Sequence, residues 1–132
     1  MIGFYDYEFE RATRNNGDFR RVLYTGKHSQ LVLMSLKPEE EIGEEVHGNI
    51  DQFFRVEEGR GVIIVDGKNC DVTDGSVVIV PAGAKHNVKN TGSSDLKLYT
   101  IYSPAEHRDG TVHKTKEEAM EKEEHFDGRT TE

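Results

Sequence analysis

The chain has 132 residues, of which 34% are hydrophobic, and a formal net charge of −8. This length allows one domain with a single core, and the negative charge argues against nucleic-acid binding, which needs a basic face. The single cysteine, Cys70, excludes an intrachain disulfide, and no apolar run is long enough to cross a bilayer. Because the N-terminus is acidic where a signal peptide would be basic, we expect a soluble, cytoplasmic protein.

Six short runs rich in branched and aromatic residues predict β-strands, and no segment between 30 and 103 has the periodicity of a helix. Turn signals separate these runs at intervals of about ten residues, which is typical of a sandwich or barrel. Asp66-Gly67 is a good hairpin signal, because Asp-Gly suits a turn that needs positive φ. The predicted strands are Arg21–Tyr24, Leu31–Leu36, Gln52–Val56, Gly61–Val65, Val77–Val80 and Leu96–Tyr102.

The stretch from 75 to 90, GSVVIVPAGAKHNVKN, combines a strand, a tight turn and a histidine. It follows the pattern G-x5-P-x-G-x2-H-x3-N. We expect residues 77 to 80 to form a buried apolar strand that Pro81 ends, and Gly83 to supply a turn conformation that other residues resist. His86 would then lie on the next strand, with its direction fixed by the turn.

A second polar cluster precedes this stretch and reads EEEIGEEVHGNIDQFF. Alternation along a strand places Glu45 and His47 on one face. In the strand after the bend, Gln52, Phe54 and Val56 would share the inner face and leave Phe53 and Arg55 outside. We therefore expect four polar groups to converge inside an apolar barrel, namely those of Glu45, His47, Gln52 and His86.

These two segments resemble the cupin family. Its second motif is matched in full by Gly75, Pro81, Gly83, His86 and Asn90. Its first motif, G-x5-H-x-H-x(3 or 4)-E-x6-G, is matched in spacing: aligned on Gly59, the glutamate falls on Gln52, the second histidine on His47, the first on Glu45 and the leading glycine on Glu39.

The resemblance implies an all-β fold, a double-stranded β-helix or jelly-roll barrel, here with a short C-terminal helix. We assign residues 1–110 to the barrel domain, including an N-terminal strand arm, and 111–132 to an acidic helical tail. In that tail, Thr115 and Glu118 form a capping box before a glutamate-rich run with few apolar residues.

Two histidines and a carboxylate suit a divalent transition metal such as Mn, Fe, Ni or Zn. We predict metal ligation by Glu45, His47 and His86, with the Gln52 amide either as a weak ligand or as a hydrogen-bonding partner of water or substrate. The alternative is a barrel that has lost its metal, and Asp51 is a reserve ligand. The remaining histidines, His28, His107, His113 and His125, are expected to lie outside the site.

The resemblance implies a small-molecule ligand, sugar-like or a carboxylate. Among the aromatic residues of the predicted strands we assign Phe54, Tyr99 and Tyr102 to its pocket, with packing in the core as the competing interpretation. In this family the metal site is associated with isomerase and dioxygenase chemistry, and a non-catalytic binding module is the competing interpretation. Unpaired sheet edges favour a homodimer. The outward-facing Phe53 fits either that interface or a contact between sheets.

Overall fold

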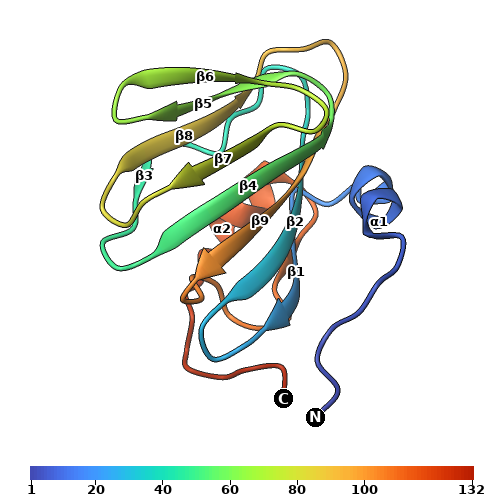
Figure 1. Ribbon diagram of the computed structural model, residues 1–132, viewed down its shortest axis with the longest axis vertical. Coiled ribbons are helices and arrows are strands. Elements are labelled where there is room, and N and C mark those ends of the chain that lie inside the picture. Colours follow the sequence, from blue (N-terminus) through green and yellow to red (C-terminus); the bar gives the residue numbers. More distant parts are fainter.

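The computed structural model describes residues 1–132 and consists mainly of two antiparallel β-sheets (Figure 1). Two short helices lie outside the sheets, α1 (Phe9–Asn15) and α2 (Lys116–Glu121). The strands are β1 (Arg20–Thr25), β2 (Gln30–Leu36), β3 (Glu45–Val46), β4 (Asp51–Glu58), β5 (Gly61–Val65), β6 (Lys68–Val72), β7 (Val77–Val80), β8 (Lys85–Asn90), β9 (Leu96–Ser103) and β10 (Val112–His113).

The strand order confirms the jelly-roll prediction. One sheet has the order β10-β1-β2-β9-β4-β7 and the other β3-β8-β5-β6, so strands distant in sequence lie side by side. Their inward side chains form one core, to which the six-stranded sheet contributes Phe54 and Leu98 and the four-stranded sheet Ile63 and Val88. Burial of such side chains, worth about 1.5–3 kcal/mol each, holds the two sheets together.

The six predicted strands are all present, but the prediction for β7 needs a correction. Residues 77 to 80 were expected to be buried throughout, whereas Val77 is 47% and Ile79 63% exposed, and only Val80 is fully buried. The cause is that β7 is the edge strand of its sheet and follows the ordinary alternation of a sheet with one covered face. In β4 the predicted alternation is confirmed from Gln52 to Val56, since Gln52, Phe54 and Val56 are buried and Phe53 and Arg55 are only partly buried, and Glu57 after them is buried as well.

The N-terminal arm contains a helix as well as a strand. Helix α1 precedes β1 and packs on the outer face of the six-stranded sheet, where the Phe9 ring contacts Tyr99 at a centroid distance of 5.0 Å. The Thr13 side chain is buried beneath it, and Arg14 pairs with Glu58 of β4. These contacts to β4 and β9 stabilise a helix that is too short to form alone.

The C-terminal tail joins the barrel. Strand β10 extends the six-stranded sheet by pairing Arg20 with His113, and Phe126 N–H donates to Glu106 O. Helix α2 begins after Thr115, whose hydroxyl oxygen accepts from Glu118 N–H, as expected for half of a capping box. Neither helix of the chain is long and apolar enough to span a membrane.

Candidate metal centre

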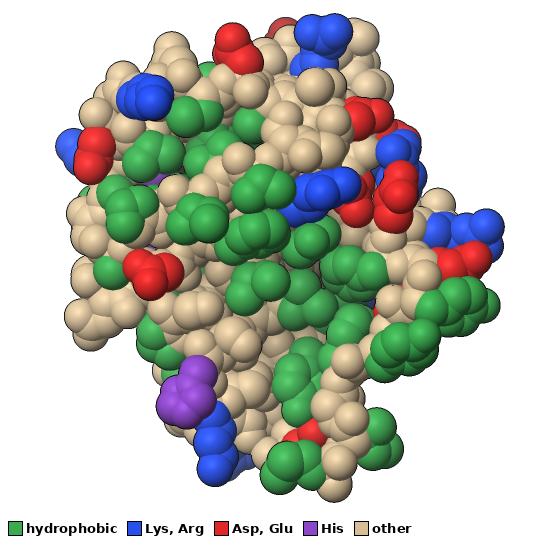
Figure 2. Space-filling model, viewed as in Figure 1, with side chains coloured by type: hydrophobic (Ala, Val, Ile, Leu, Met, Phe, Trp, Pro, Cys, Tyr) green, Lys and Arg blue, Asp and Glu red, His purple; other side chains and the backbone are tan.

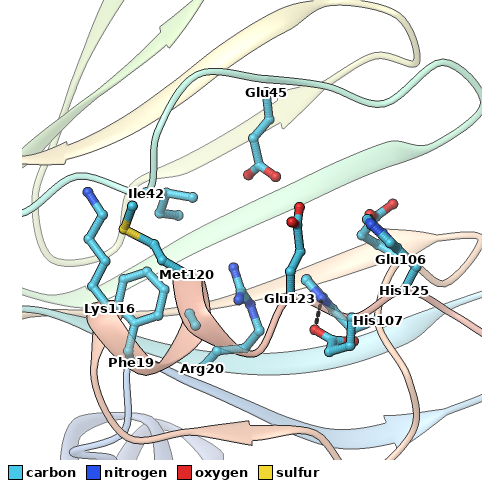
Figure 3. Close-up of a pocket in the computed structure, with 12 residues that line it drawn as sticks. Phe19, Arg20, Ile42, Glu45, Glu106, His107, Lys116, Met120, Glu123 and His125 are labelled. Carbon is cyan, nitrogen blue, oxygen red and sulfur yellow. Dashed lines mark hydrogen bonds and ion pairs between the residues drawn. The ribbon is translucent and has the colours of Figure 1, made fainter.

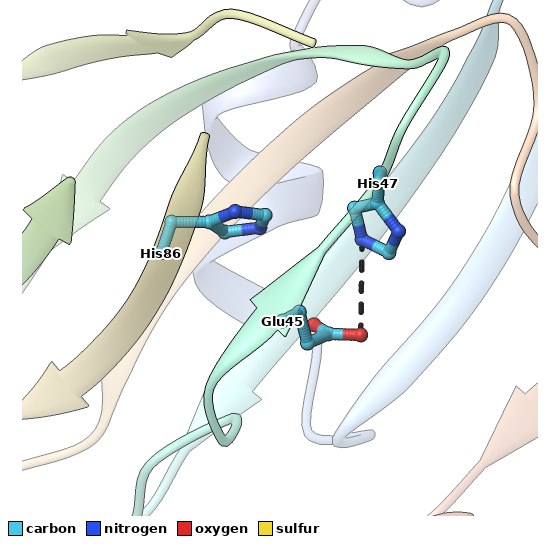
Figure 4. Close-up of side chains that lie close together, drawn as sticks. All are labelled: Glu45, His47 and His86. Atoms are coloured by element: carbon cyan, nitrogen blue, oxygen red, sulfur yellow. Dashed lines mark ion pairs between the residues drawn. The ribbon is translucent and has the colours of Figure 1, made fainter. Parts of the chain in front are cut away.

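Three predicted ligands meet inside the barrel (Figure 4). Strand pairing places Glu45 of β3 directly opposite His86 of β8, and His47 follows β3 at the bend. Their ligand atoms all lie within 4.8 Å of one another. The Pro81–Gly83 turn assists, because Gly83 has a φ of 87° and its N–H donates to His47 O at 2.8 Å. The two sequence motifs are therefore hydrogen-bonded to each other beside the site.

The two imidazoles are oriented in the same way. His86 Nδ1 lies 3.1 Å from the Ala84 carbonyl oxygen, and His47 Nδ1 lies 3.4 Å from the Glu106 carboxylate. Each of these acceptors favours the tautomer that carries its proton on Nδ1, which leaves the Nε2 lone pair free. Both Nε2 atoms are buried and have no hydrogen-bond partner. The donor set thus has the properties of a metal site, because such orphaned nitrogens are otherwise costly.

Glu45 completes the group from the more open side. Its Oε2 lies 3.7 Å from His47 Nε2, and its side chain is 34% exposed, whereas that of His47 is 9% exposed. One carboxylate and two neutral imidazoles suit first-row transition metals. A divalent ion held by them would retain one positive charge, which is favourable for polarising a bound oxygen.

Gln52 lies in the same interior, at the position where the family motif has glutamate. Its side chain is buried, its Nε2 donates to Thr100 Oγ1 at 3.0 Å, and its Oε1 has no partner. An unpartnered amide oxygen suits either role foreseen for Gln52, a weak ligand or an acceptor from bound water. Its contact with an ion stays a prediction.

Of the three residues predicted to contact substrate, two lie near the histidines and one lies on the other face of the sheet. Tyr102 is buried with its ring 6.0 Å from that of His47, and Phe54 is a core residue 6.2 Å from His86, both distances between ring centroids. Tyr99 is not brought to the site: it lies on the outer face of the sheet between Phe9 and Phe53. Alternation explains this, since the inward side chains of β9 are those at 98, 100 and 102. The position of Tyr99 does not support the predicted role.

The reserve ligand Asp51 lies outside the group. Its side chain is exposed and its Oδ1 accepts from Ala82 N–H at 2.8 Å, so it caps the Pro81 turn instead. After the bend that follows His47, Gln52 faces the barrel interior and Asp51 does not, as predicted.

We call Glu45, His47 and His86 the metal group. A cavity of about 310 Å³ lies beside it, between the barrel and α2 (Figure 3). It includes Glu45, as well as Glu106, whose carboxylate lies beside His47. Its other walls come from the N-terminal part of the sheet and from the tail. The lining residues are Phe19, Arg20, Ile42, Glu45, Glu106, His107, Lys116, Ala119, Met120, Glu123, Glu124 and His125.

Two of the later histidines lie outside the group of Glu45, His47 and His86, as expected, but closer to it than the sequence indicated. His107 and His125 line the cavity, and His107 is 6% exposed. Glu106, which contacts both His47 and His125, was also missed. Nothing in their sequence spacing marks these residues, because the loop after β9 and the tail reach the cavity only through the tertiary fold.

His107 links the barrel interior to the tail. Its Nδ1 donates to Glu124 at 2.9 Å and its Nε2 accepts from the Tyr102 hydroxyl at 3.1 Å. Burial lowers the pKa of His107, against the effect of the Glu124 carboxylate, so the ring is neutral at pH 7. Burial would raise the pKa of Glu124, but hydrogen bonds from His107 and Arg108 N–H hold it at about 2. Burial raises the pKa of Tyr102, which therefore keeps its proton and donates it.

Two antiparallel sheets closed around a cluster of two histidines and a glutamate define a cupin barrel. Residues 32–102 match the family model described as the cupin domain, and the chain belongs to the cupin family. This confirms the family resemblance drawn from the two motifs.

Among known proteins, YrkC of Bacillus subtilis is 52% identical over 117 residues, which are 83% of this chain and 62% of YrkC. The chain thus spans less than two thirds of that relative. A solved structure of BH2720 from Bacillus halodurans is 45% identical, with a TM-score of 0.87, and the match covers 89% of this chain and 94% of that one. An oxalate-binding protein of Thermotoga maritima is 28% identical over 67 residues, 52% of this chain and 56% of its own length.

Proposed function

We propose that this cupin holds one divalent transition metal at Glu45, His47 and His86 and binds a small polar molecule, sugar-like or a carboxylate, in the adjoining cavity. The observation that carries the proposal is the pair of buried Nε2 atoms without partners, facing a carboxylate inside a 4.8 Å group. A metal bound there would polarise a substrate carbonyl or hydroxyl, or activate water or O2.

The chain's own residues would act on the bound molecule in distinct ways. Glu106 lies beside His47 and would position its ring, and Tyr102, whose hydroxyl donates to His107, would position that second imidazole at the cavity wall. Helix α2 covers the cavity and reduces its contact with water. These roles fit a metal-dependent isomerase or a dioxygenase, the two reaction classes considered from the sequence.

A second candidate is a binding module without turnover. The name of the Thermotoga relative, an oxalate-binding protein, favours it, because that protein is described by the ligand it binds. Both candidates use the same metal group. They differ in whether the bound molecule is converted.

The metal content of purified protein tests the shared part of both candidates. We expect about one equivalent of a first-row transition metal in the wild type and less than about a tenth of that in His47→Ala and His86→Ala. His28→Ala, at an exposed histidine of the β1–β2 turn, is the matched control and should retain the metal. Retention of metal by both site variants would disprove the assigned ligands.

Turnover assays with and without oxygen then separate the reaction classes. An isomerase is indifferent to oxygen, and a dioxygenase stops without it. A metal-loaded protein that binds an acid or a sugar but converts none in either condition is a binding module.

We also propose that two copies pair through the outer face of the six-stranded sheet (Figure 2). Hydrophobic side chains gather on this face. Val77 and Ile79 of β7 are exposed, and they alternate with the buried Val80 and so lie on the outer side of the same sheet. Strand β7 is a sheet edge whose outer backbone groups are unpaired. A second copy placed there would cover the apolar side chains and the edge together.

A further inference from the structure

Arg20 is a buried cation without a carboxylate partner. Arg20 is 8% exposed, and it takes part in none of the ion pairs of the chain. Its Nε is buried and has no hydrogen-bond partner. Glu124 lies near enough for an electrostatic interaction with Arg20 but forms no ion pair with it. The buried guanidinium therefore keeps donors that no carboxylate of the chain accepts from, which suits it to bind an anion.

The fold holds this guanidinium in place. Arg20 lies opposite His113 in the pairing of β1 with β10, and its Nη1 is 3.2 Å from His113 Nδ1. Its Cζ lies over the Phe19 ring at 5.3 Å from the centroid. These contacts fix the side chain before any ligand arrives, which lowers the entropy lost on binding.

The guanidinium points into the cavity that adjoins the metal group. Figure 3 shows Arg20 on one wall and Glu45, a member of the metal group, on the opposite wall of this cavity. A ligand in the cavity would therefore lie between a fixed planar cation and the metal. The tail forms the remaining side, through lining residues that include Met120 and Glu123.

We infer that Arg20 binds the carboxylate of a small organic acid in this cavity, and that a second oxygen-bearing group of the same acid faces the metal. This inference rests on the proposed function, and it selects acids over sugars within it. The planar fork of arginine matches the two oxygens of a carboxylate, which a neutral sugar does not offer. The cavity volume of about 310 Å³ suits a molecule of a few carbon atoms.

The charges around the cavity favour a carboxylate over a phosphate. Four glutamates line it, Glu45, Glu106, Glu123 and Glu124, against the two permanent cations Arg20 and Lys116. One carboxylate can be compensated by Arg20 alone. A dicarboxylate divides its two charges between Arg20 and the metal, whereas a phosphate dianion carries both charges on one small group and would need a second cation close to Arg20.

Calorimetric titration of the metal-loaded protein with oxalate, malonate and succinate tests the inference, with inorganic phosphate and glucose as comparison ligands. We expect at least one acid to bind, and Arg20→Gln to weaken its binding by about tenfold or more. Arg20→Lys, which keeps the charge without the fork, should bind more weakly than the wild type and serves if the glutamine variant does not fold. Arg21→Gln is the matched control, since Arg21 is exposed and pairs with Asp18.

Metal content is measured on every variant, so that failure of the metal site and failure of the Arg20 site are distinguished. Equal acid affinity of wild type and Arg20 variants would overturn the inference. Tighter binding of phosphate than of all three acids would also overturn the inference, as would the absence of acid binding by metal-loaded wild type. Neither result would count against the proposed metal site. If the wild type takes up no metal, the proposed function fails. The same titrations of metal-free protein then test whether Arg20 binds a carboxylate without the metal.

Discussion

At His47 and His86, the two histidines proposed as ligands, the contact made by Nδ1 determines whether Nε2 is free to bind an ion. The Ala84 carbonyl and the Glu106 carboxylate lie beside the Nδ1 atoms, and both Nε2 atoms are left buried without partners. The short spacing of Glu45 and His47 was enough to predict that they share a face. Glu106 could not be predicted, because it joins the site from a loop almost sixty residues further along the chain.

The Gln52 position offers a direct test of how near its side chain lies to the ion. Replacing Gln52 with Glu substitutes a charged oxygen donor for a weak neutral one, at unchanged size. We expect metal affinity to rise by about tenfold or more, measured by competition with a chelator. The Thr100 hydroxyl, which accepts from Gln52 Nε2, can instead donate to a glutamate at this position.

The conservative variant Gln52→Asn serves as a control for packing, since it shortens the side chain without adding charge. Unchanged metal affinity in Gln52→Glu would show that this oxygen does not reach the ion. Gln52 would then act only through bound water or ligand.

At the scale of elements, apolar patterning predicted the bounds of strands rich in branched residues well, and it missed the polar or very short elements. The runs at β5 and β7 match the observed bounds, since branched residues dominate them. Strand β6, KNCDV, is largely exposed at an edge, and the two-residue β10 depends on its pairing with β1. Helix α1 depends on contacts with β4 and β9, which no local pattern reveals.

The attachment of the tail to the barrel predicts a pH-dependent effect of Glu124→Gln. At pH 7 the free energy of unfolding of the variant should be about 1–2 kcal/mol lower than that of the wild type, because the variant loses a charge-assisted hydrogen bond to His107. The folded pKa of Glu124, about 2, lies below its ordinary value of 4.5. Its stabilising contribution is therefore complete above pH 4.5 and is lost as the pH falls towards 2.

Urea unfolding of both proteins between pH 7 and pH 3 measures this contribution. The difference between wild type and Glu124→Gln should shrink as the pH falls below 4.5. The groups that face Glu124 are His107 and Arg20, besides the Arg108 backbone. Glu117→Gln, on the exposed side of α2, should show no such trend, and a constant difference for Glu124→Gln would contradict the account.

At the scale of the whole molecule, the outer face of the six-stranded sheet predicts the oligomeric state. Ile79→Lys places a charge at the most exposed apolar position of β7. In a symmetric dimer the substitution is present in both copies, and each lost isoleucine contact costs about 1.5 kcal/mol or more. The dissociation constant of the dimer should therefore rise about a hundredfold or more. Sedimentation velocity across a concentration series measures this change.

Val112→Lys is the control for this experiment, because Val112 is an exposed apolar residue on β10, the opposite edge of the same sheet. It should leave the dimer intact. A wild type that sediments as a monomer at all concentrations would contradict the proposed pairing.

The metal group itself is the central claim, and an anomalous difference map from crystals of the protein purified without added metal tests it most directly. Data collected on both sides of the absorption edge of the metal found by elemental analysis locate the ion. We predict one strong peak at about 2.0–2.2 Å from Nε2 of His47, Nε2 of His86 and a carboxylate oxygen of Glu45. A peak elsewhere in the molecule, or ligation through the Nδ1 atoms, would contradict the account.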